Sequence, residues 1–557
     1  MSNSHNPPSI IDSFCLFEET KANKLFLSEP VNQVYQNFTW QSAGTEIRRM
    51  SAAITALGLN KGDKIAILSK NCAYWIMADM AIMMAGCISV PLYPNITPAS
   101  LNEILIHSDS KMIFLGKLDD PEKMKAGVPD QLIRVCFPFY PIRNCLVWTD
   151  ITKDHLPLKG KPEIDEDALA CIIYTSGTTG QPKGVMHTYR SMNYAVASFL
   201  KANPTIQNEI FFSYLPLCHV AEKMLVECGT LFTGSTMYFA ESMDRFSINL
   251  KHTQPTIFLA VPRIWEKMKE EILRKLPQKK LDKILSLPII SNLFKKIIRK
   301  KLGLSRAHFI FTGASPINKA LLEWYDKLGI TIMEAYGMTE NLALSHANRK
   351  NAGIFGTVGT AYPEVSVRLG EDQEVQVKSM ASMQGYYKEP ALSAECFEDG
   401  YLKTGDQGFI DSNGFLTITG RIKDQFKTSK GKYICPAPIE SKLLANCFID
   451  QACVVGNGMP HALAICILSE AAKLEEKAIL EITLVRFLAT INEELEHHEK
   501  ISKLVLIASE WTIENGILTP TLKIKRNKVD KLYEQYYTTW GNRPESVISA
   551  TESVHYE

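Results

Sequence analysis

The chain has 557 residues, more than one ordinary hydrophobic core can organise, so two to four domains or subdomains are expected. Its composition is 46% apolar and 22% charged, close to the globular average, which excludes wholesale disorder. The net charge of +1 excludes a general electrostatic argument for nucleic acid binding, so any basic character must be local.

The cysteines and the apolar stretches indicate the compartment. The 13 cysteines include no Cys-x-x-Cys pair, which argues against a disulfide framework or zinc ribbon and favours a reducing compartment. Residues 1–11 lack a signal-peptide pattern. The longest apolar stretch, 75–92, contains Asp79 and is interrupted at Gly86, so it predicts a buried helix and strand rather than a membrane span. We therefore expect a cytoplasmic protein.

Short apolar runs alternate with helical segments from Lys64 to about residue 335. The first predicted elements are strand 65–68, helix 74–85, strand 87–92, helix 98–109 and strand 112–115. Further strands are predicted at 169–174, 211–215, 236–239, 257–260, 309–312 and 331–335. Strands separated by helices of this length predict βαβ units and parallel sheets.

The pattern changes after about Gly356 to β-rich and turn-rich, with strands predicted at 365–369, 375–377 and 415–419. The polar, Lys-rich stretch 420–432 predicts a hinge, followed by a smaller α+β unit with a helix at 483–495 and a strand at 504–508. The prediction is an α/β fold: an N-terminal domain, 1–420, with parallel sheets and a β-rich subdomain, and a small α+β C-terminal domain, 421–557.

Residues 174–184 read YTSGTTGQPKG and follow a predicted buried strand. Glycines, hydroxyls, exposed backbone N–H groups and Lys183 together can surround a phosphate group. The spacing does not fit a Walker A loop. Alone, this stretch fits either phosphate binding or a surface turn, which Gly/Thr-rich stretches usually form.

Residues 267–301 carry 12 Lys/Arg and only three acidic residues. Six apolar residues share one face of the predicted helix there: Ile289, Ile290, Leu293, Phe294, Ile297 and Ile298. This pattern is typical of a helix on an anionic membrane surface, and peripheral contact with the inner face of a membrane is our hypothesis. The alternative, somewhat favoured at this stage, is a helix packed on the sheet with a solvated basic face.

Seven further short motifs follow the phosphate-loop candidate in a specific order. They are YLPLCH at 214–219, AVPRIWE at 260–266, TGASP at 312–316, YGMTE at 336–340, YLKTGD at 401–406, GRIKD at 420–424 and PTLKIKR at 520–526. Together they resemble the adenylate-forming (AMP-binding) superfamily, and within it the long-chain fatty acyl-CoA synthetases. The resemblance extends from about Thr39 to Lys528, nearly the whole chain.

The resemblance implies an active site between a large N-terminal domain and a mobile C-terminal lid. It also implies a fatty acid–CoA ligase that uses ATP, Mg²⁺ and coenzyme A. The acid's carboxylate attacks the α-phosphate of ATP to give acyl-adenylate and pyrophosphate, and the thiol of coenzyme A then displaces AMP. The first step joins two anions, so its barrier is largely electrostatic.

By resemblance, each motif supplies part of the site. The β- and γ-phosphates would be held by Thr175, Ser176, Gly177, Thr178 and Thr179, with Lys183 nearby. Glu340 would ligate Mg²⁺, and Thr339 would contact the α-phosphate. Gly313, Ala314 and Ser315 would line the adenine slot, where Tyr336, followed by Gly337, would stack on the base. Asp406 would accept the ribose hydroxyls and Arg421 would add donors; without the resemblance, Asp406 would read as a turn residue.

Lys523 matches the lysine that bridges the substrate carboxylate and the α-phosphate, although Leu522 stands where many relatives carry glycine. Lys423 matches the hinge, and Lys432 matches the position facing coenzyme A or the acyl site in the second conformation. His219 matches the gate between the nucleotide and the acyl channel, although alone it would read as a core histidine. Arg263, Trp265 and Glu222 match the fatty acyl subset in position, without an assigned role.

Several functions remain open at this stage. The same fold could activate a medium-chain, aromatic or amino acid, or could load a carrier protein. However, residues 215–221 offer no acidic partner for an amine, and no carrier domain is visible. A catalytically silent lipid- or nucleotide-binding protein is the alternative of a different class. The sequence does not determine the acyl chain length of the substrate or whether the protein is a monomer or a homodimer.

Overall fold

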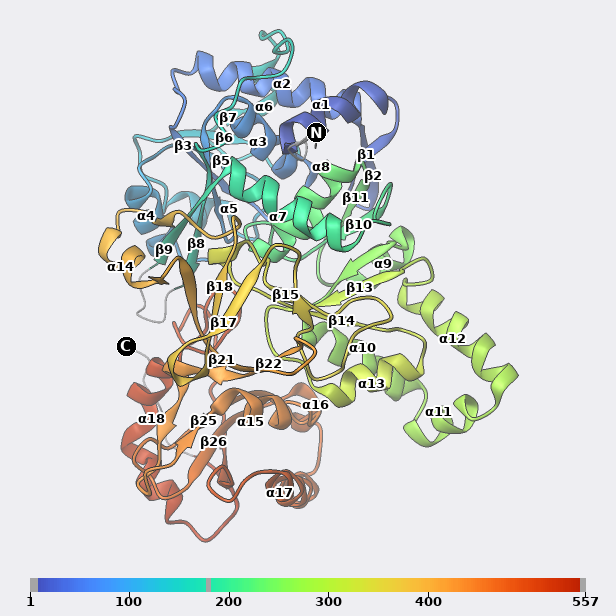
Figure 1. Ribbon diagram of the computed structural model, residues 1–557, viewed down its shortest axis with the longest axis vertical. Helices are drawn as coiled ribbons and strands as arrows, with labels where there is room; N and C mark the ends of the chain where they lie inside the picture. The colour runs from blue at the N-terminus through green and yellow to red at the C-terminus, as the bar shows by residue number, and fades with distance from the viewer. Residues whose placement is uncertain (1–8, 177–181, 551–557) are drawn as a thin grey trace.

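The computed structural model describes residues 9–176 and 182–550, in a mixed α/β arrangement with a large N-terminal part and a small C-terminal part (Figure 1). The predicted phosphate-loop residues Gly177, Thr178 and Thr179 lie outside the described residues. The helices are α1 (Ile10–Thr20), α2 (Trp40–Ala56), α3 (Ala73–Met84), α4 (Pro98–His107), α5 (Pro121–Lys125), α6 (Trp148–Thr152), α7 (Tyr189–Ala202), α8 (Gly229–Thr233), α9 (Phe246–Thr253), α10 (Pro262–Lys275), α11 (Gln278–Leu285), α12 (Pro288–Leu302), α13 (Lys319–Lys327), α14 (Pro390–Glu395), α15 (Pro436–Leu443), α16 (Glu470–Lys473), α17 (Lys477–Glu494) and α18 (Arg526–Gly541).

The predicted parallel sheet is present as the centre of an eight-stranded sheet in the order β19-β9-β8-β4-β3-β5-β6-β7. The strands are β3 (Lys64–Leu68), β4 (Ile88–Leu92), β5 (Ser110–Leu115), β6 (Ile133–Cys136), β7 (Leu146–Val147), β8 (Leu169–Ser176), β9 (Pro182–Thr188) and β19 (Gly385–Tyr386). β8 and β9 pair antiparallel, with Thr175 opposite Lys183. The described ends of the predicted phosphate loop, up to Ser176 and from Pro182, are therefore paired strands.

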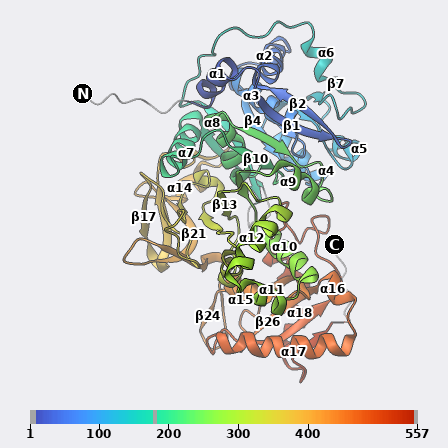
Figure 2. The same cartoon turned by 90° about the vertical axis from the view of Figure 1, so that its right-hand side faces the viewer.

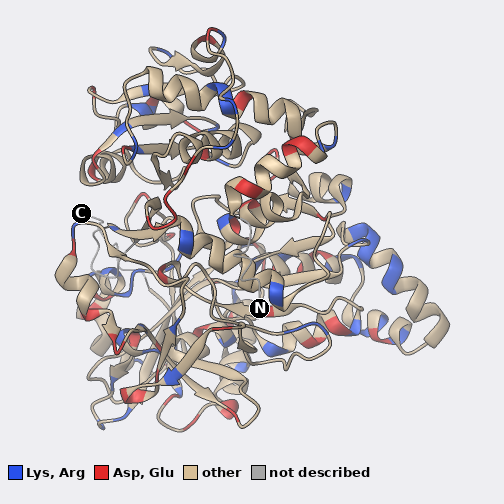
Figure 3. Ribbon diagram, turned by 45° about the horizontal axis from the view of Figure 1, so that its top comes forward, with Lys and Arg blue, Asp and Glu red and all other residues tan. Residues whose placement is uncertain are grey.

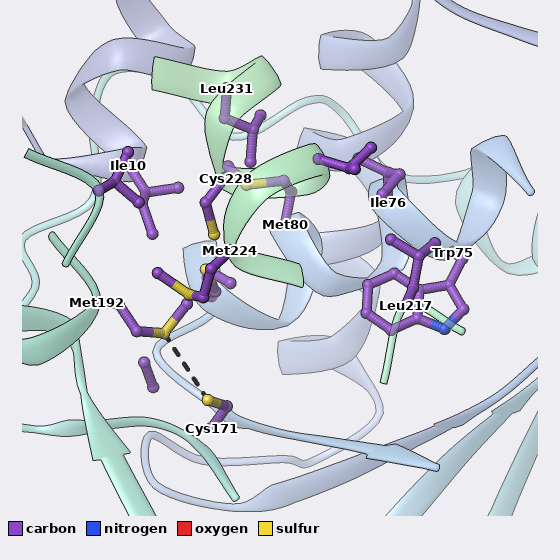
Figure 4. Packing of buried hydrophobic residues seen from close by; sticks show 14 of the residues in the cluster. Ile10, Trp75, Ile76, Met80, Cys171, Met192, Leu217, Met224, Cys228 and Leu231 are labelled. Carbon is purple, nitrogen blue, oxygen red and sulfur yellow. Dashed lines mark hydrogen bonds between the residues drawn. The ribbon is translucent and has the colours of Figure 1, made fainter. Parts of the chain in front are cut away.

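The largest hydrophobic cluster surrounds α3, in which all 12 residues are buried. α3 lies on β3 and β4 and is covered by α1 and α2, which explains why its sequence is apolar on every side. Figure 4 shows Trp75, Ile76 and Met80 of α3 among sulfur-containing side chains of the neighbouring elements. Asp79 is buried in this helix and pairs with Lys223 at 2.7 Å, which satisfies the charge inside the core.

A second layer contains two further sheets. The order β10-β11-β1-β2 comprises β1 (Leu25–Val31), β2 (Val34–Thr39), β10 (Ile210–Ser213) and β11 (Thr236–Phe239). The order β12-β13-β14-β15-β16 comprises β12 (Ile257–Leu259), β13 (Phe309–Thr312), β14 (Met333–Tyr336), β15 (His346–Ala347) and β16 (Thr360–Ala361). β12, β13 and β14 are parallel, as predicted, and their carboxyl ends face the site described below.

The β-rich region predicted after residue 356 is an antiparallel sheet. Its strands are β17 (Ser366–Leu369), β18 (Glu374–Lys378), β20 (Phe397–Glu398), β21 (Tyr401–Ile410) and β22 (Leu416–Arg421). In the β21–β22 pair, Asp406 stands opposite Arg421. This register brings residues from two separate sequence motifs side by side.

The C-terminal part, at the lower end of Figures 1 and 2, has a separate four-stranded sheet in the order β25-β26-β27-β28. Its strands are β25 (Ile449–Val455), β26 (Ala462–Leu468), β27 (Ile501–Ile507) and β28 (Val547–Ser549), and the two-stranded pair β23 (Phe426–Lys427) and β24 (Tyr433–Ile434) precedes it. The sheet buries one apolar cluster with α15 and α17 and another with α18. It is the α+β unit that the sequence predicts, although α17 begins six residues before the predicted helix.

Candidate functional site

A cleft of about 1960 Å³ is lined by residues of both the N-terminal and C-terminal parts. Most residues singled out in the sequence meet there. Those lining it are Thr175, Lys183, His219, Ala314, Ser315, Tyr336, Gly337, Thr339, Glu340, Asp406, Arg421 and Lys523. Strand β14 and the short segments after β13 and β14 supply one wall, while β21, β22 and the 520–526 loop supply another.

Asp406 is the centre of a charged hydrogen-bond cluster at this cleft. The Tyr336 hydroxyl donates to one carboxylate oxygen at 2.7 Å, and Arg421 Nε lies 2.8 Å from the other. Burial and the neighbouring carboxylate raise the pKa of Tyr336, so its hydroxyl stays protonated and can donate. Asp406 belongs to β21 and is buried, which excludes the interpretation of this aspartate as a turn residue.

Two glycines let backbone segments approach closely beside Tyr336. A Cβ at Gly313 would lie 2.9 Å from the Ala335 carbonyl oxygen, and one at Gly337 would lie 2.5 Å from Ala343 Cα. Gly313 therefore holds the end of β13 against β14, and Gly337 allows the turn that begins at Tyr336 to fold back. Ala314 follows with φ of 67°, which directs the 314–316 backbone along the cleft.

Glu340, the predicted metal ligand, is held by a tyrosine that the sequence analysis did not identify. The Tyr386 hydroxyl donates to Glu340 Oε1 at 2.8 Å, and Met383 N donates to the Glu340 backbone carbonyl at 2.7 Å. Lys183 Nζ lies 5.5 Å from the centre of the Tyr386 ring. Tyr386 thus connects the strand after the phosphate loop to Glu340 and leaves carboxylate lone pairs free toward the cleft.

His187 is a second residue that sequence reasoning missed. It is fully buried on β9, and its Nε2 lies 2.8 Å from the backbone carbonyl of Thr339. Burial lowers the pKa of His187 to about 4, so the imidazole is neutral at physiological pH and carries its proton on Nε2 to donate this bond. The contact fixes the Thr339–Glu340 segment against the hairpin of the phosphate loop.

Glu334 also lines the cleft, and burial raises its pKa to about 8. Its carboxyl group is therefore protonated at neutral pH and can donate a hydrogen bond. It lies two residues before Tyr336 on β14, so strand alternation places both on one face. That alternation was a usable signal for Glu334, whereas no spacing in the sequence marks His187 or Tyr386.

Lys523 comes from the C-terminal part and extends into the cleft. Its ammonium group interacts electrostatically with Arg421, Asp406 and Glu340. The side chain is open to the cleft, but the surrounding protein removes it from bulk water, and this desolvation, with the charge of Arg421, lowers its pKa. Its backbone N–H donates to Thr519 Oγ1 at 3.0 Å and its carbonyl accepts from Thr519 N at 2.8 Å, and the intervening Leu522 has φ of 61°. The glycine of many relatives thus corresponds to a left-handed position here.

His219 stands where the polar cleft meets a narrow apolar cavity of about 100 Å³, and it lines both. Its Nδ1 accepts the backbone N–H of Ala221 at 3.2 Å. Burial, and secondarily the charge of Lys523, lowers the pKa of His219 to about 4, so it is neutral. Ala314, Tyr336 and Gly337 also line both spaces. An anionic group in the cleft could therefore carry an apolar group into the cavity.

The remaining candidates lie in or beyond these walls. Lys423 lines the cleft in the short helix Ile422–Asp424, whereas Gly313 lines the apolar cavity. Lys432 is exposed in the turn between β23 and β24 and does not line the cleft in this conformation. Arg263 pairs with Asp450 of the C-terminal part at 2.5 Å, and Glu222 is buried and accepts the backbone N–H of Tyr214. Ser176 ends β8, directly before the segment outside the described residues.

Comparison with known families agrees with this arrangement. The AMP-binding enzyme profile matches residues 18–387, and the profile of the AMP-binding enzyme C-terminal domain matches residues 423–538. The chain belongs to the AMP-binding enzyme family. The resemblance to adenylate-forming enzymes stated from the motifs is thereby confirmed.

Individual relatives agree over most of their length. The long-chain-fatty-acid–CoA ligase FadD15 of Mycobacterium bovis is 27% identical over 90% of this chain and 91% of its own. The human long-chain-fatty-acid–CoA ligase 1 is 29% identical over 89% of this chain and 83% of its own. The structure of the o-succinylbenzoate coenzyme A synthetase MenE of Bacillus subtilis with AMP superposes with a TM-score of 0.72 at 19% identity, covering 93% and 97% of the two chains. The last comparison confirms the predicted fold class.

Proposed function

We propose that this AMP-binding enzyme is a long-chain fatty acid–CoA ligase that forms acyl-AMP and then acyl-CoA. The observation that carries the proposal is the junction of a polar cleft and an apolar cavity at His219 and Gly337, with Lys523 extending into the cleft from the C-terminal part. The cleft would hold the anionic reacting group of the acid, and the cavity would hold its apolar tail. The two ligases of similar sequence support the chain-length assignment.

In the first half-reaction, a carboxylate oxygen of the acid attacks the α-phosphorus, and the bond to the pyrophosphate oxygen breaks. We assign Lys523 to the charge that builds between carboxylate and α-phosphate, with Thr339 beside it. The Asp406–Tyr336–Arg421 cluster would hold the ribose, and Gly313, Ala314, Ser315 and the protonated Glu334 would face the base. Thr175 and Lys183, with residues 176–179, would hold the leaving pyrophosphate.

Magnesium fits the carboxylate of Glu340, whose tyrosine partner occupies one oxygen and leaves lone pairs toward the cleft. The described residues contain no group of three or more His, Cys, Asp or Glu side chains that could hold a metal by themselves. Mg²⁺ commonly binds through one or two carboxylates together with substrate phosphates, and a single Glu suits that mode. When bound, the ion would neutralise phosphate charge during adenylation.

In the second half-reaction the thiolate of coenzyme A attacks the acyl carbonyl and AMP leaves. We propose that the C-terminal domain, residues 421–557, turns about Lys423 between the two steps. This would withdraw Lys523 and bring Lys432, now outside the cleft, toward coenzyme A. The interaction of Lys523 with the cleft supports assigning the present arrangement to the first half-reaction.

The small volume of the apolar cavity favours a second candidate function, activation of a smaller acid. Its volume of about 100 Å³ is smaller than the ~300 Å³ at the lower end of ordinary ligand pockets. A long chain therefore requires Met224, Leu225 or Phe199 to move, whereas a compact aromatic or medium-chain acid needs less rearrangement. The aromatic acid named for the Bacillus relative makes this same-fold alternative concrete.

A panel of acids tests the proposal directly. Saturated acids from short to very long chain, with benzoate and o-succinylbenzoate, are assayed for thioester formation dependent on ATP and coenzyme A. We expect kcat/KM to rise with chain length into the long-chain range. A maximum at an aromatic or medium-chain acid would replace the long-chain assignment, transfer only to a carrier protein would replace the acceptor, and no AMP release with any acid would favour a silent binding protein.

A further inference from the structure

Helices α11 and α12 form a hairpin that projects from the edge of the N-terminal part and is seen from two sides in Figures 1 and 2. Its tip exposes apolar side chains. Ile289 is 87% exposed, Leu293 62% and Ile290 51%, and Leu287 and Ile297 continue the same surface. The sequence-based alternative, in which this apolar face packs on the sheet, is wrong for these residues.

The helix is nevertheless firmly anchored on its other side. Ile298 and Ser291 are buried against the body, and Phe294 packs on the hydrophobic cluster beneath. Arg299, from the basic side, donates to the backbone carbonyls of Leu304 and Gly329 at 3.3 and 3.2 Å. The outward direction of the apolar tip is therefore set by tertiary packing.

Basic residues surround the tip. Lys279, Lys280 and Lys283 are exposed on α11, and Lys296 and Lys300 are exposed on α12, which carries no acidic residue (Figure 3). Helical spacing puts Lys296 and Lys300 on the same face as Ile289 and Leu293, farther from the tip. Asp282, the acid within the hairpin, accepts a hydrogen bond from the Gln278 amide at 2.7 Å. Apolar residues at the end and lysines behind them match the depth profile of an anionic bilayer surface.

We propose that the hairpin tip, residues 286–297, inserts into the headgroup region of an anionic lipid bilayer and anchors the enzyme peripherally. Ile289, Ile290 and Leu293 enter the acyl boundary, while Lys279, Lys283, Lys296 and Lys300 contact lipid phosphates. None of the helices in the described ranges is long and apolar enough to cross a membrane, so surface attachment is the mode that this hairpin provides. The proposal is independent of the acid substrate, because no hairpin residue lines the cleft or cavity.

Vesicle flotation of the full chain tests the anchor. Vesicles of phosphatidylcholine alone are compared with vesicles that also contain phosphatidylglycerol, at low and high salt. We expect binding only with the anionic lipid, weakening as salt shortens the Debye length. The affinity for anionic vesicles should fall about fivefold for each lysine replaced in K296Q/K300Q. It should fall about a hundredfold in I289S/L293S.

The matched control is L156S/L474S, which replaces leucines that are 83% and 89% exposed elsewhere on the surface. It should bind vesicles like the unaltered chain, and all variants should retain vesicle-free activity, which shows that they fold. Equal binding by I289S/L293S, or binding without anionic lipid, would overturn the proposal. A dimer detected by light scattering that I289S/L293S converts to monomer would assign the tip to a second copy of this chain instead.

Discussion

The cleft brings together two regions that are held in place very differently. The nucleotide side is cross-linked by residues that precede the proposed pivot at Lys423: Tyr336 and Arg421 hold Asp406, and Tyr386 holds Glu340. The lysine side reaches the cleft from the C-terminal part, which we propose to be a mobile domain. Contacts holding that domain include Asn95 Nδ2 to the Pro520 carbonyl at 3.0 Å and the half-exposed Arg263–Asp450 pair.

This difference suggests that nucleotide binding and the adenylation step depend on different regions of the cleft. The Asp406 carboxylate is buried, and hydrogen bonds to charged groups are worth about 1.5–3 kcal/mol each, so we expect the nucleotide side to be preorganised in any position of the C-terminal part. A partly exposed ion pair contributes about 0–1 kcal/mol, so docking of the lysine side is readily reversed. We therefore expect damage to the first region to affect both half-reactions, and damage to the second to affect adenylation selectively.

Replacing Asp406 should have the largest effect on the nucleotide side. Asp406→Ala removes the acceptor shared by Tyr336 and Arg421 and leaves the arginine without its carboxylate. We expect KM for ATP to rise roughly a hundredfold. Because AMP occupies the site in both steps, thioester formation from supplied acyl-adenylate should fall as well. Asp399→Ala, which removes a surface partner of Arg368, is the control; a defect confined to one half-reaction would argue against a shared nucleotide anchor.

Tyr386→Phe deletes one hydrogen bond to the proposed magnesium ligand. Adenylation should slow about tenfold, the value of one hydrogen bond to a charged group, and the effect should diminish at high Mg²⁺. Tyr387→Phe is a close control, because its hydroxyl also donates to a carboxylate, Asp109, at 2.7 Å but away from the cleft. Identical adenylation kinetics for the two variants would show that Tyr386 does not contribute to the site.

The raised pKa of Glu334 predicts a pH effect. Below about pH 8 the carboxyl is neutral, and above it a buried negative charge faces the bound nucleotide. The affinity for ATP should therefore fall by up to about tenfold per pH unit above pH 8. The same shift means that the contribution of Glu334 to stability falls as pH rises from 4.5 to about 8.

Glu334→Gln should abolish this fall in ATP affinity and keep a donor in place. Glu222→Gln serves as the comparison, since burial raises its pKa to about 8 as well, but it does not line the cleft. Binding isotherms of both variants at pH 7 and pH 9 decide the matter. A fall that persists in Glu334→Gln would trace the pH dependence to another group.

Arg263→Ala should have the smallest effect, because its pair with Asp450 is solvent-screened. A weakened dock should lower the rate of adenylation about two- to fivefold and leave thioester formation unchanged. Arg274→Ala, on the same helix, is the control. If both half-reactions slow equally, the pair stabilises the fold and not the docked lid.

The order of the motifs was sufficient to predict the family, and most of the residues that the motifs singled out line the cleft, because several motifs place a polar side chain at a strand end. Whether Asp406 is a turn residue or a site residue was decided only by the structure, in which Asp406 lies on a strand opposite Arg421. His187 and Tyr386 could not be found, since each acts through a residue more than 40 positions away. The apolar face predicted for α12 is divided in the structure: Ile289, Ile290, Leu293 and Ile297 are exposed, whereas Ile298 is buried and Phe294 packs on the body. The outward direction of the exposed part depends on the inward packing of Ile298 and on the hydrogen bonds of Arg299.

We propose that Lys523 serves adenylation alone. Lys523→Ala is measured in two assays, acid-dependent pyrophosphate exchange with ATP and thioester formation from supplied acyl-adenylate, with Lys525→Ala as the control. Loss of a charge-stabilising donor predicts at least about a hundredfold loss of exchange. We expect thioester formation to survive nearly intact and Lys525→Ala to spare both assays; equal loss of the two activities in Lys523→Ala would show that Lys523 is not specific to adenylation.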